Sequence, residues 1–267
     1  MTTASATDRP ATAPAPGTSR PSTGSAGSSA YPLRTLRLHL AERDHAYLAP
    51  VLLLCAVVVV TILIGLILGI ALGFPLPAQV GEGFRTNNLG VIWALTGFFI
   101  SSAALSVNRT FATVLALGGT RRDYWLGATT GFVITSLITG VTALVLLLIE
   151  NATDGYVLGV HAIDVHLLGG GDILRTFVTA FLFALSGLLM GAAFGTVFRA
   201  FGPKVLTLVI SGVGLVVIGL VALAVWQWET TLQIAQGTGS WLVPLIMLVI
   251  VLVAGAGSLL AIRRASV

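Results

Sequence analysis

Six long apolar segments dominate the pattern of hydrophobic and polar positions along this 267-residue chain, and ionisable residues are nearly absent from their interiors. A helix of about 20 apolar residues crosses the ~30 Å hydrocarbon core of a bilayer. The sequence therefore predicts an all-α polytopic membrane protein with six transmembrane helices. The predicted spans are residues 48–74, 89–107, 124–149, 173–198, 205–228 and 241–262.

The chain before the first span divides into two parts. Residues 1–30 consist mainly of Ala, Pro, Ser, Thr and Gly without a hydrophobic pattern, which predicts a disordered tail. In residues 33–47, leucines recur at helical spacing and arginines lie largely on other faces, which predicts an amphipathic elbow helix on the membrane surface. An irregular lead-in to the first span is the alternative. Residues 31–267 are expected to form a single six-helix transmembrane domain.

The distribution of basic residues predicts the orientation. A mean hydropathy of +0.98 and 9% charged residues exclude an ordinary soluble domain. When the connections are assigned to alternate sides, Arg85 and Arg175 fall on one side and the other twelve basic residues on the opposite side. The positive-inside rule places those twelve, and both termini, in the cytoplasm. Thirteen arginines against one lysine, with abundant Ala and Gly, favour a bacterial plasma membrane.

Glycines recur at helical spacing in the first and fourth predicted spans. Such ridges of small residues let helix backbones approach closely where lipid supplies no hydrophobic driving force. Two interpretations remain open, which are a contact with a second copy of the chain and tight packing within one chain. The ridge glycines are Gly65, Gly69, Gly73, Gly187, Gly191 and Gly195.

The connection between the second and third spans is the most structured of the predicted cytoplasmic connections. Residues 108–117 carry apolar side chains at positions that would share one face of a helix, which predicts a short separate helix. Gly118 and Gly119 follow and are expected to end it, because glycine readily adopts the left-handed conformation found after many helices.

The next residues predict where the third span begins. Thr120, followed three residues later by Asp123, resembles a capping pair at a helix start. Arg121 and Arg122 give the connection a basic corner. The alternative is a lipid-facing turn whose arginines only determine the topology.

The longest predicted outer connection, residues 150–172, shows partial alternation of apolar and polar residues. We expect it to lie on the membrane as an extended or short helical cap. His161, Asp164 and His166 suggest a metal site, but no fourth ligand accompanies them in the sequence. We therefore expect no metal.

Catalytic and ion-coupling chemistry is absent from the predicted spans. The only lysine, Lys204, does not lie in a Gly-Lys-Ser/Thr sequence, so the chain lacks a Walker-type phosphate loop. No carboxylate lies at mid-depth, where a charge is costly and is kept for a function. Glu150 and Arg175 are expected at outer span ends, facing water or the interface. We predict no catalytic residue and no cofactor in this chain, and therefore no enzyme.

This layout resembles the membrane subunit of type-2 ATP-binding-cassette (ABC) exporters, in particular the small six-helix permeases of bacteria. The likeness extends over residues 33–264. Its most specific part is residues 115–127, LALGGTRRDYWLG, which resemble the Gly-x-x-Arg-Arg-x-aromatic stretch common in these permeases.

The resemblance implies a separate ATPase subunit that binds ATP, and a complex of two permeases with two ATPases. In that family the loop after the second span is a coupling helix seated in a groove of the ATPase. The expected partners are thus an ABC ATPase, a second permease copy and the lipid bilayer, with no nucleic acid. Carried over to this sequence, the coupling role falls to Thr110, Phe111, Val114, Leu115, Leu117, Arg121 and Arg122.

Two other functions remain open on the sequence. One is a carrier or facilitator that works without an ATPase, and the other is a non-transporting membrane anchor or sensor. The substrate is not indicated, because the chain has no large extramembrane domain that would point to one.

Overall fold

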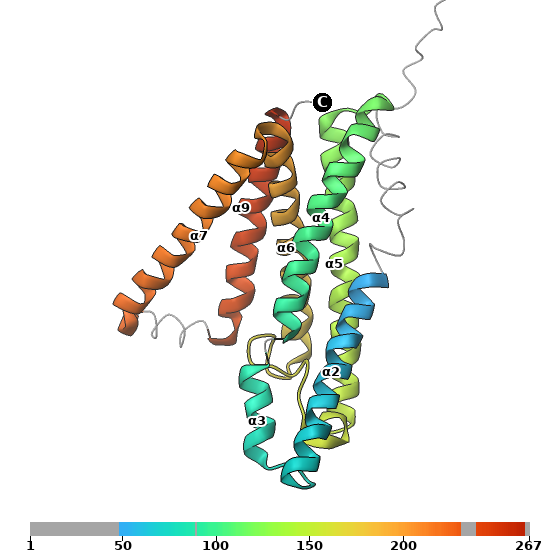
Figure 1. Ribbon diagram of the computed structural model, residues 1–267, viewed down its shortest axis with the longest axis vertical. Helices are drawn as coiled ribbons and strands as arrows, with labels where there is room; N and C mark the ends of the chain where they lie inside the picture. Colours follow the sequence, from blue (N-terminus) through green and yellow to red (C-terminus); the bar gives the residue numbers. More distant parts are fainter. Residues whose placement is uncertain (1–47, 89, 231–238, 265–267) are drawn as a thin grey trace, which may run out of the picture.

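The computed structural model describes residues 48–88, 90–230 and 239–264, and the regular secondary structure within these ranges is entirely helical (Figure 1). The predicted tail 1–30 and the predicted elbow helix 33–47 lie outside the described residues. Within the described ranges, six helices are long and apolar enough to cross a membrane, as predicted. The chain is a helical protein of the multi-pass membrane class.

Within the described residues, the connections between the six long helices contain three small helical elements. The long helices are α2 (Ala49–Leu72), α4 (Gly90–Ala116), α5 (Arg121–Ala152), α6 (Ile173–Phe201), α7 (Pro203–Trp226) and α9 (Leu242–Arg264). The small elements are α3 (Ala78–Asn87), the π-helix η2 (Gly155–Gly159) and the 3-10 helix η3 (Gly239–Trp241). We call the end that carries residues 117–120 the turn end, and the end that carries α3 and residues 153–172 the loop end.

Two features of the helix order differ from the prediction. Residues 108–116 do not form a separate short helix, because they continue α4 to Ala116. Helix α3 was not predicted, since its sequence is polar and none of its residues is buried. It follows the turn after α2 and lies at the loop end (Figure 1).

Helix α6 forms the centre of the bundle and packs against α4, α5 and α9. It is the most buried of the six long helices, and its buried face is rich in glycine and alanine. Phe99 and Val107 of α4 and Leu147 of α5 are fully buried around it. Because the small residues on α6 leave room for large ones on its neighbours, α6 can pack closely against these helices.

Helix α7 diverges from the other long helices toward the loop end (Figure 1). It begins directly after Gly202, whose φ of +81° favours glycine, and Pro203 occupies its first turn. None of its residues is buried among the described part of the chain. A helix that is apolar on all sides and unburied requires lipid or another protein around it.

Candidate functional site

The α4–α5 turn is built from local signals in the sequence. Gly118 has a φ of +84° and ends α4 at the position where glycine was expected. Thr120 caps α5 by accepting the Asp123 N–H through its hydroxyl, while the Asp123 carboxylate accepts the Thr120 N–H. The predicted capping pair is therefore confirmed. Two satisfied N–H groups at the start of α5 define the direction in which it leaves the turn.

Beneath this turn, an aromatic and cationic cluster joins three helices. The rings of Phe111 and Tyr124 meet edge to face, with centroids 5.1 Å apart, and both side chains are buried. The Tyr124 hydroxyl lies 3.1 Å from Thr110 Oγ1. Arg199 of α6 lies over the Phe111 ring at 5.2 Å and donates to the Asn108 carbonyl at 2.9 Å. The turn is therefore held against α6 by directional contacts.

The expected coupling residues separate into buried and exposed sets. Phe111 and Val114 are buried within the chain and do not offer a surface to another subunit. Leu117 is 66% exposed at the tip of the turn, Arg122 is exposed, and Arg121 is half-buried. Thr110 and Leu115 are half-buried. The apolar face predicted for residues 108–117 thus points largely into the bundle. Arg199 also holds the α4–α5 turn in place, and this role was not predicted from the sequence.

The glycine ridge of α6 packs against the neighbouring helix of the same chain. A Cβ added at Gly187 would lie 2.9 Å from Phe99 Cβ, and one at Gly195 would lie 3.1 Å from the Ala104 carbonyl oxygen. At Gly191, an added Cβ would overlap the backbone carbonyl of Ile100. These glycines allow α4 and α6 to touch along their backbones.

The glycine ridge of α2 is also covered mainly by its own chain. A Cβ at Gly65 would lie 2.5 Å from a Val160 methyl group, and one at Gly69 would overlap the Phe74 ring. Gly73 lies in open space with a φ of +93°, at the end of the helix. Gly65 and Gly69 are therefore not open to a second copy in this arrangement.

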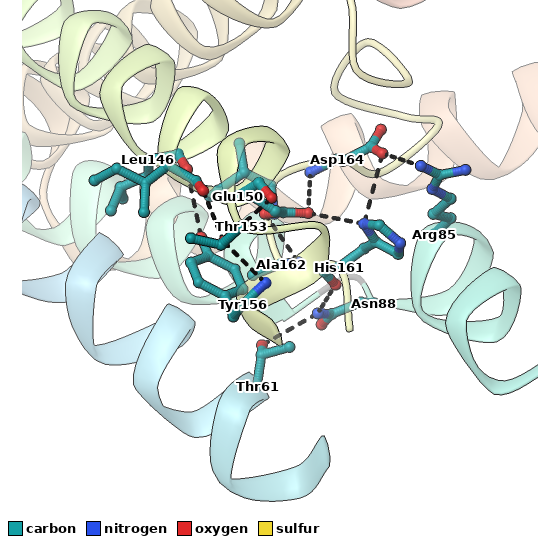
Figure 2. Close-up of polar contacts among 12 residues, drawn as sticks. Thr61, Arg85, Asn88, Leu146, Glu150, Thr153, Tyr156, His161, Ala162 and Asp164 are labelled. Atoms are coloured by element: carbon teal, nitrogen blue, oxygen red, sulfur yellow. Dashed lines mark hydrogen bonds and ion pairs between the residues drawn. The ribbon is translucent and has the colours of Figure 1, made fainter. Parts of the chain in front are cut away.

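At the loop end, the Glu150 carboxylate organises the connection 153–172. Its side chain is fully buried, which corrects the expectation that it faces water. Glu150 Oε2 accepts the N–H groups of Ala162 and Ile163 at 3.3 and 2.8 Å, and Oε1 accepts the Asp164 N–H at 3.2 Å. His161 Nδ1 lies 3.1 Å from Oε1 (Figure 2). One carboxylate thus replaces the backbone partners that this non-helical segment lacks.

Further polar contacts attach this segment to α2 and α3. Arg85 of α3 pairs with Asp164 at 2.6 Å. Asn88 donates to the His161 carbonyl at 3.0 Å and to Thr61 of α2 at 3.2 Å (Figure 2). As a result, the connection is folded inward and its residues 160 and 162–165 are buried. The expectation that it lies on the membrane surface as a cap is therefore wrong.

The three residues that suggested a metal site in the sequence, His161, Asp164 and His166, are not all brought together. His166 lies outside the group of His161 and Asp164 and contacts the exposed Glu82 at 3.0 Å, where its hydrogen bond holds the pKa of that carboxyl below its usual value. Glu150, His161 and Asp164 do bring ligand atoms within 4.8 Å of one another. Glu150, however, already accepts three N–H groups, and the Arg85 guanidinium occupies Asp164. A cation would have to displace these donors. Glu150, His161 and Asp164 therefore fit a structural role, in which they hold the connection 153–172 in place.

The backbone geometry at the start of the connection also indicates that Glu150 and its partners hold this segment in place. Asp154, Tyr156 and Val157 all have positive φ, between 51° and 67°. This conformation is rare for a β-branched residue such as Val157, whose side chain is 84% exposed. Such a segment persists only where its surroundings hold it, and the Glu150 contacts that follow in the sequence supply that restraint.

Comparison of the chain with family models, with curated proteins and with solved structures gave no match.

Proposed function

We propose that this chain is the permease subunit of an ABC transporter of the bacterial plasma membrane, with its turn end in the cytoplasm and a separate ATPase subunit bound there. The observation that carries the proposal is the α4–α5 turn. It exposes Leu117 and Arg122 at its tip, and the buried Phe111 and Tyr124, together with the half-buried Arg199, hold it against the bundle.

A turn held in this way suits mechanical coupling between subunits. Movement of the tip would be transmitted to α4, α5 and α6 together, because the cluster beneath it contacts all three helices. The sequence has no phosphate-binding loop of its own, so the energy for transport would come from the partner. The resemblance of residues 115–127 to bacterial ABC permeases supports the same function.

The burial of the expected coupling residues reduces the number that could touch the ATPase. Leu117, Arg121 and Arg122 form the contact surface in this proposal, while Phe111 and Val114 support it from within. An apolar tip flanked by two arginines would bind a groove that combines an apolar floor with acidic rims.

Reversal of both charges, R121E/R122E, is expected to abolish co-purification of the ATPase encoded with this chain and to lower transport at least tenfold. The reason is that two repulsive contacts replace two attractive ones at one interface. The measurement is pull-down of the ATPase from membranes, together with ATP-dependent transport in proteoliposomes. K204E, which reverses a charge in the first turn of α7 at the same end, is the control for a general charge effect.

Other outcomes of this experiment would point to the alternative functions. Transport by the purified chain without any ATPase would replace the proposal with a carrier or facilitator. Binding of a partner at the turn without solute flux would replace it with an anchor or sensor. Full ATPase binding by R121E/R122E would show that the turn is not the contact.

We further propose that two copies pair through α7, since it is the long helix with no buried residue in the described part of the chain. In a C55S background, L215C on α7 is expected to crosslink two copies. I67C on α2, with a similar exposed fraction of 65% against 70%, is expected not to. The measurement is the dimer fraction after oxidation in native membranes. Crosslinking at position 67 alone would move the interface to α2.

A further inference from the structure

Helix α2 lies at a different depth from the other long helices. Figure 1 shows it extending toward the loop end, past the ends of α4, α7 and α9. Thr61, in the middle of α2, accepts a hydrogen bond from Asn88, two residues before the start of α4. Gly90, the first residue of α4, lies beside Val57. Residues 62–72 of α2 therefore extend about 16 Å beyond the start of α4, at a rise of about 1.5 Å per residue.

The remaining helices indicate where the bilayer lies. Leu54 of α2 lines a small apolar cavity together with Leu95 of α4 and Ala180 of α6, so these three residues share one depth. From this depth toward the turn end, α4 continues to Ala116 and α6 to Phe201, about 32 Å in each case. This length matches the hydrocarbon core of a bilayer, about 30 Å. Helix α2 begins only five residues before Leu54 and so enters this layer by about 8 Å.

Exposed charged groups lie beside the outer half of α2. Leu68 of α2 shares a groove with Val80 and Phe84 of α3, so the two helices are neighbours there. Glu82 of α3 contacts His166, and their side chains are 58% and 59% exposed. Because exposed ionisable groups are costly in hydrocarbon, this end of the molecule belongs in water or among lipid head groups.

The outer half of α2 nevertheless has the composition of a membrane-spanning segment. Residues 49–72 contain no charged side chain, and they include the most apolar segment of the six long helices. Ile64, Ile67, Ile70 and Leu72 are all exposed, Ile70 by 74%. A helix of this kind is stable when lipid or protein surrounds it, whereas here its outer half faces water. A position closer to the turn end would bring these side chains into the bilayer.

The packing of α2 allows displacement in whole helical turns. Thr61 is the only hydroxyl-bearing residue of α2, and the rest of the face that it shares is apolar or small. Eleven residues make almost three full turns, so a shift of that length returns the same face to the bundle. Displacement of one packed element past another by whole turns is a known type of switching movement. The buried face consists of Pro50, Leu54, Val58, Thr61, Gly65 and Gly69.

We propose that α2 slides between two registers, the outward one seen here and an inward one displaced by three turns, about 16 Å, toward the turn end. In the inward register Leu72 lies beside Asn88, in the place that Thr61 occupies now. Residues 62–72 are then within the bilayer. The contact of Gly65 with Val160 is released, while Glu150 keeps the connection 153–172 on α5.

Two disulfides test the two registers in native membranes, in a C55S background. T61C/N88C joins positions that lie together in the outward register, where the two side chains bond at 3.2 Å. L72C/N88C joins positions that meet only in the inward register, since about 16 Å now separates them along the bundle and a disulfide needs Cα atoms within about 7 Å. I67C/N88C is the matched control, because Ile67 lies on another face of α2 and fits neither register.

The measurement is the fraction of chains that no longer react with PEG-maleimide after oxidation and denaturation. We expect T61C/N88C and L72C/N88C each to form about tenfold more disulfide than I67C/N88C. If L72C/N88C formed no more than the control, α2 would have a single register and the proposal would fall. Absence of the T61C/N88C disulfide would also overturn it, because the outward register would not be populated. Gel filtration of the reduced variants checks that each is folded.

A bimane label on I67C gives a second readout that leaves Thr61 and Asn88 in place. Aqueous iodide reaches the label in the outward register, and dibrominated phosphatidylcholine reaches it in the inward register, so we expect quenching by both. L215C, in the middle of α7 and similarly exposed, should be quenched by the lipid only. Quenching at position 67 by only one of the two agents would overturn the proposal, since α2 would then occupy one depth. None of these measurements requires an ATPase, so their outcome is independent of the proposed transport function.

Discussion

Replacement of Glu150 by alanine is expected to lower the free energy of unfolding by about 3–5 kcal/mol, a loss typical of breaking a buried charged network. The substitution removes the acceptor for the N–H groups of Ala162, Ile163 and Asp164, which stay buried without partners. It also removes the carboxylate beside His161. Each unpaired buried donor is costly because no water replaces the lost acceptor.

The conservative replacement E150Q should rescue little of this loss. Three backbone N–H groups donate to Glu150, and both carboxylate oxygens accept from the backbone. A glutamine amide keeps one acceptor oxygen but turns an NH2 group toward N–H donors. E82A is the control, because Glu82 is a carboxylate at the same end whose side chain is 58% exposed and bonded to His166, and we expect a change below about 0.5 kcal/mol.

The measurement is the thermal unfolding midpoint in detergent by fluorescence-detected gel filtration, combined with hydrogen exchange of residues 160–168. Both Glu150 variants should show a lowered midpoint and faster exchange in this segment, whereas E82A should show neither. Wild-type exchange rates in E150A would mean that the connection is held by Arg85 and Asn88 without the carboxylate.

The contrast between the α4–α5 turn and Glu150 shows what the sequence alone could predict. Gly118, Thr120 and Asp123 act on residues within a few positions of themselves, so their roles followed from local order. The partners of Glu150 lie 11 to 14 residues later, in a segment without helical periodicity. No local signal indicates that this segment folds back, and a carboxylate at a span end is ordinarily read as solvent-facing.

The boundaries of α4 and the glycine ridges illustrate a second limit. Arg109 and the nearby hydroxyls lower the hydropathy after residue 107, so the predicted span ended there, although the helical backbone continues to Ala116. Spacing identified the glycines of α2 and α6 as sites of close approach. It did not identify what approaches them, because that depends on how the helices are arranged in space.

Replacement of Gly191 by alanine is expected to lower the free energy of unfolding by about 1–3 kcal/mol, as overpacking of a tight contact does. The added Cβ would overlap the carbonyl of Ile100, which belongs to the α4 backbone and cannot rotate away as a side chain would. Helix α4 must therefore move as a unit, which also disturbs the contacts at Gly187 and Gly195. Truncation of the Ile100 side chain, as I100A, should not rescue the variant.

G212A provides a matched control with the opposite expected sign. Gly212 lies inside α7 with no atom within 4 Å of an added Cβ, so alanine there removes only the conformational cost of glycine and should stabilise by up to about 1 kcal/mol. Thermal midpoints of the two variants measured in the same detergent give the comparison. If both shifted upward by similar amounts, α4 and α6 could not be in backbone contact at Ile100, and the central position of α6 would need to be revised.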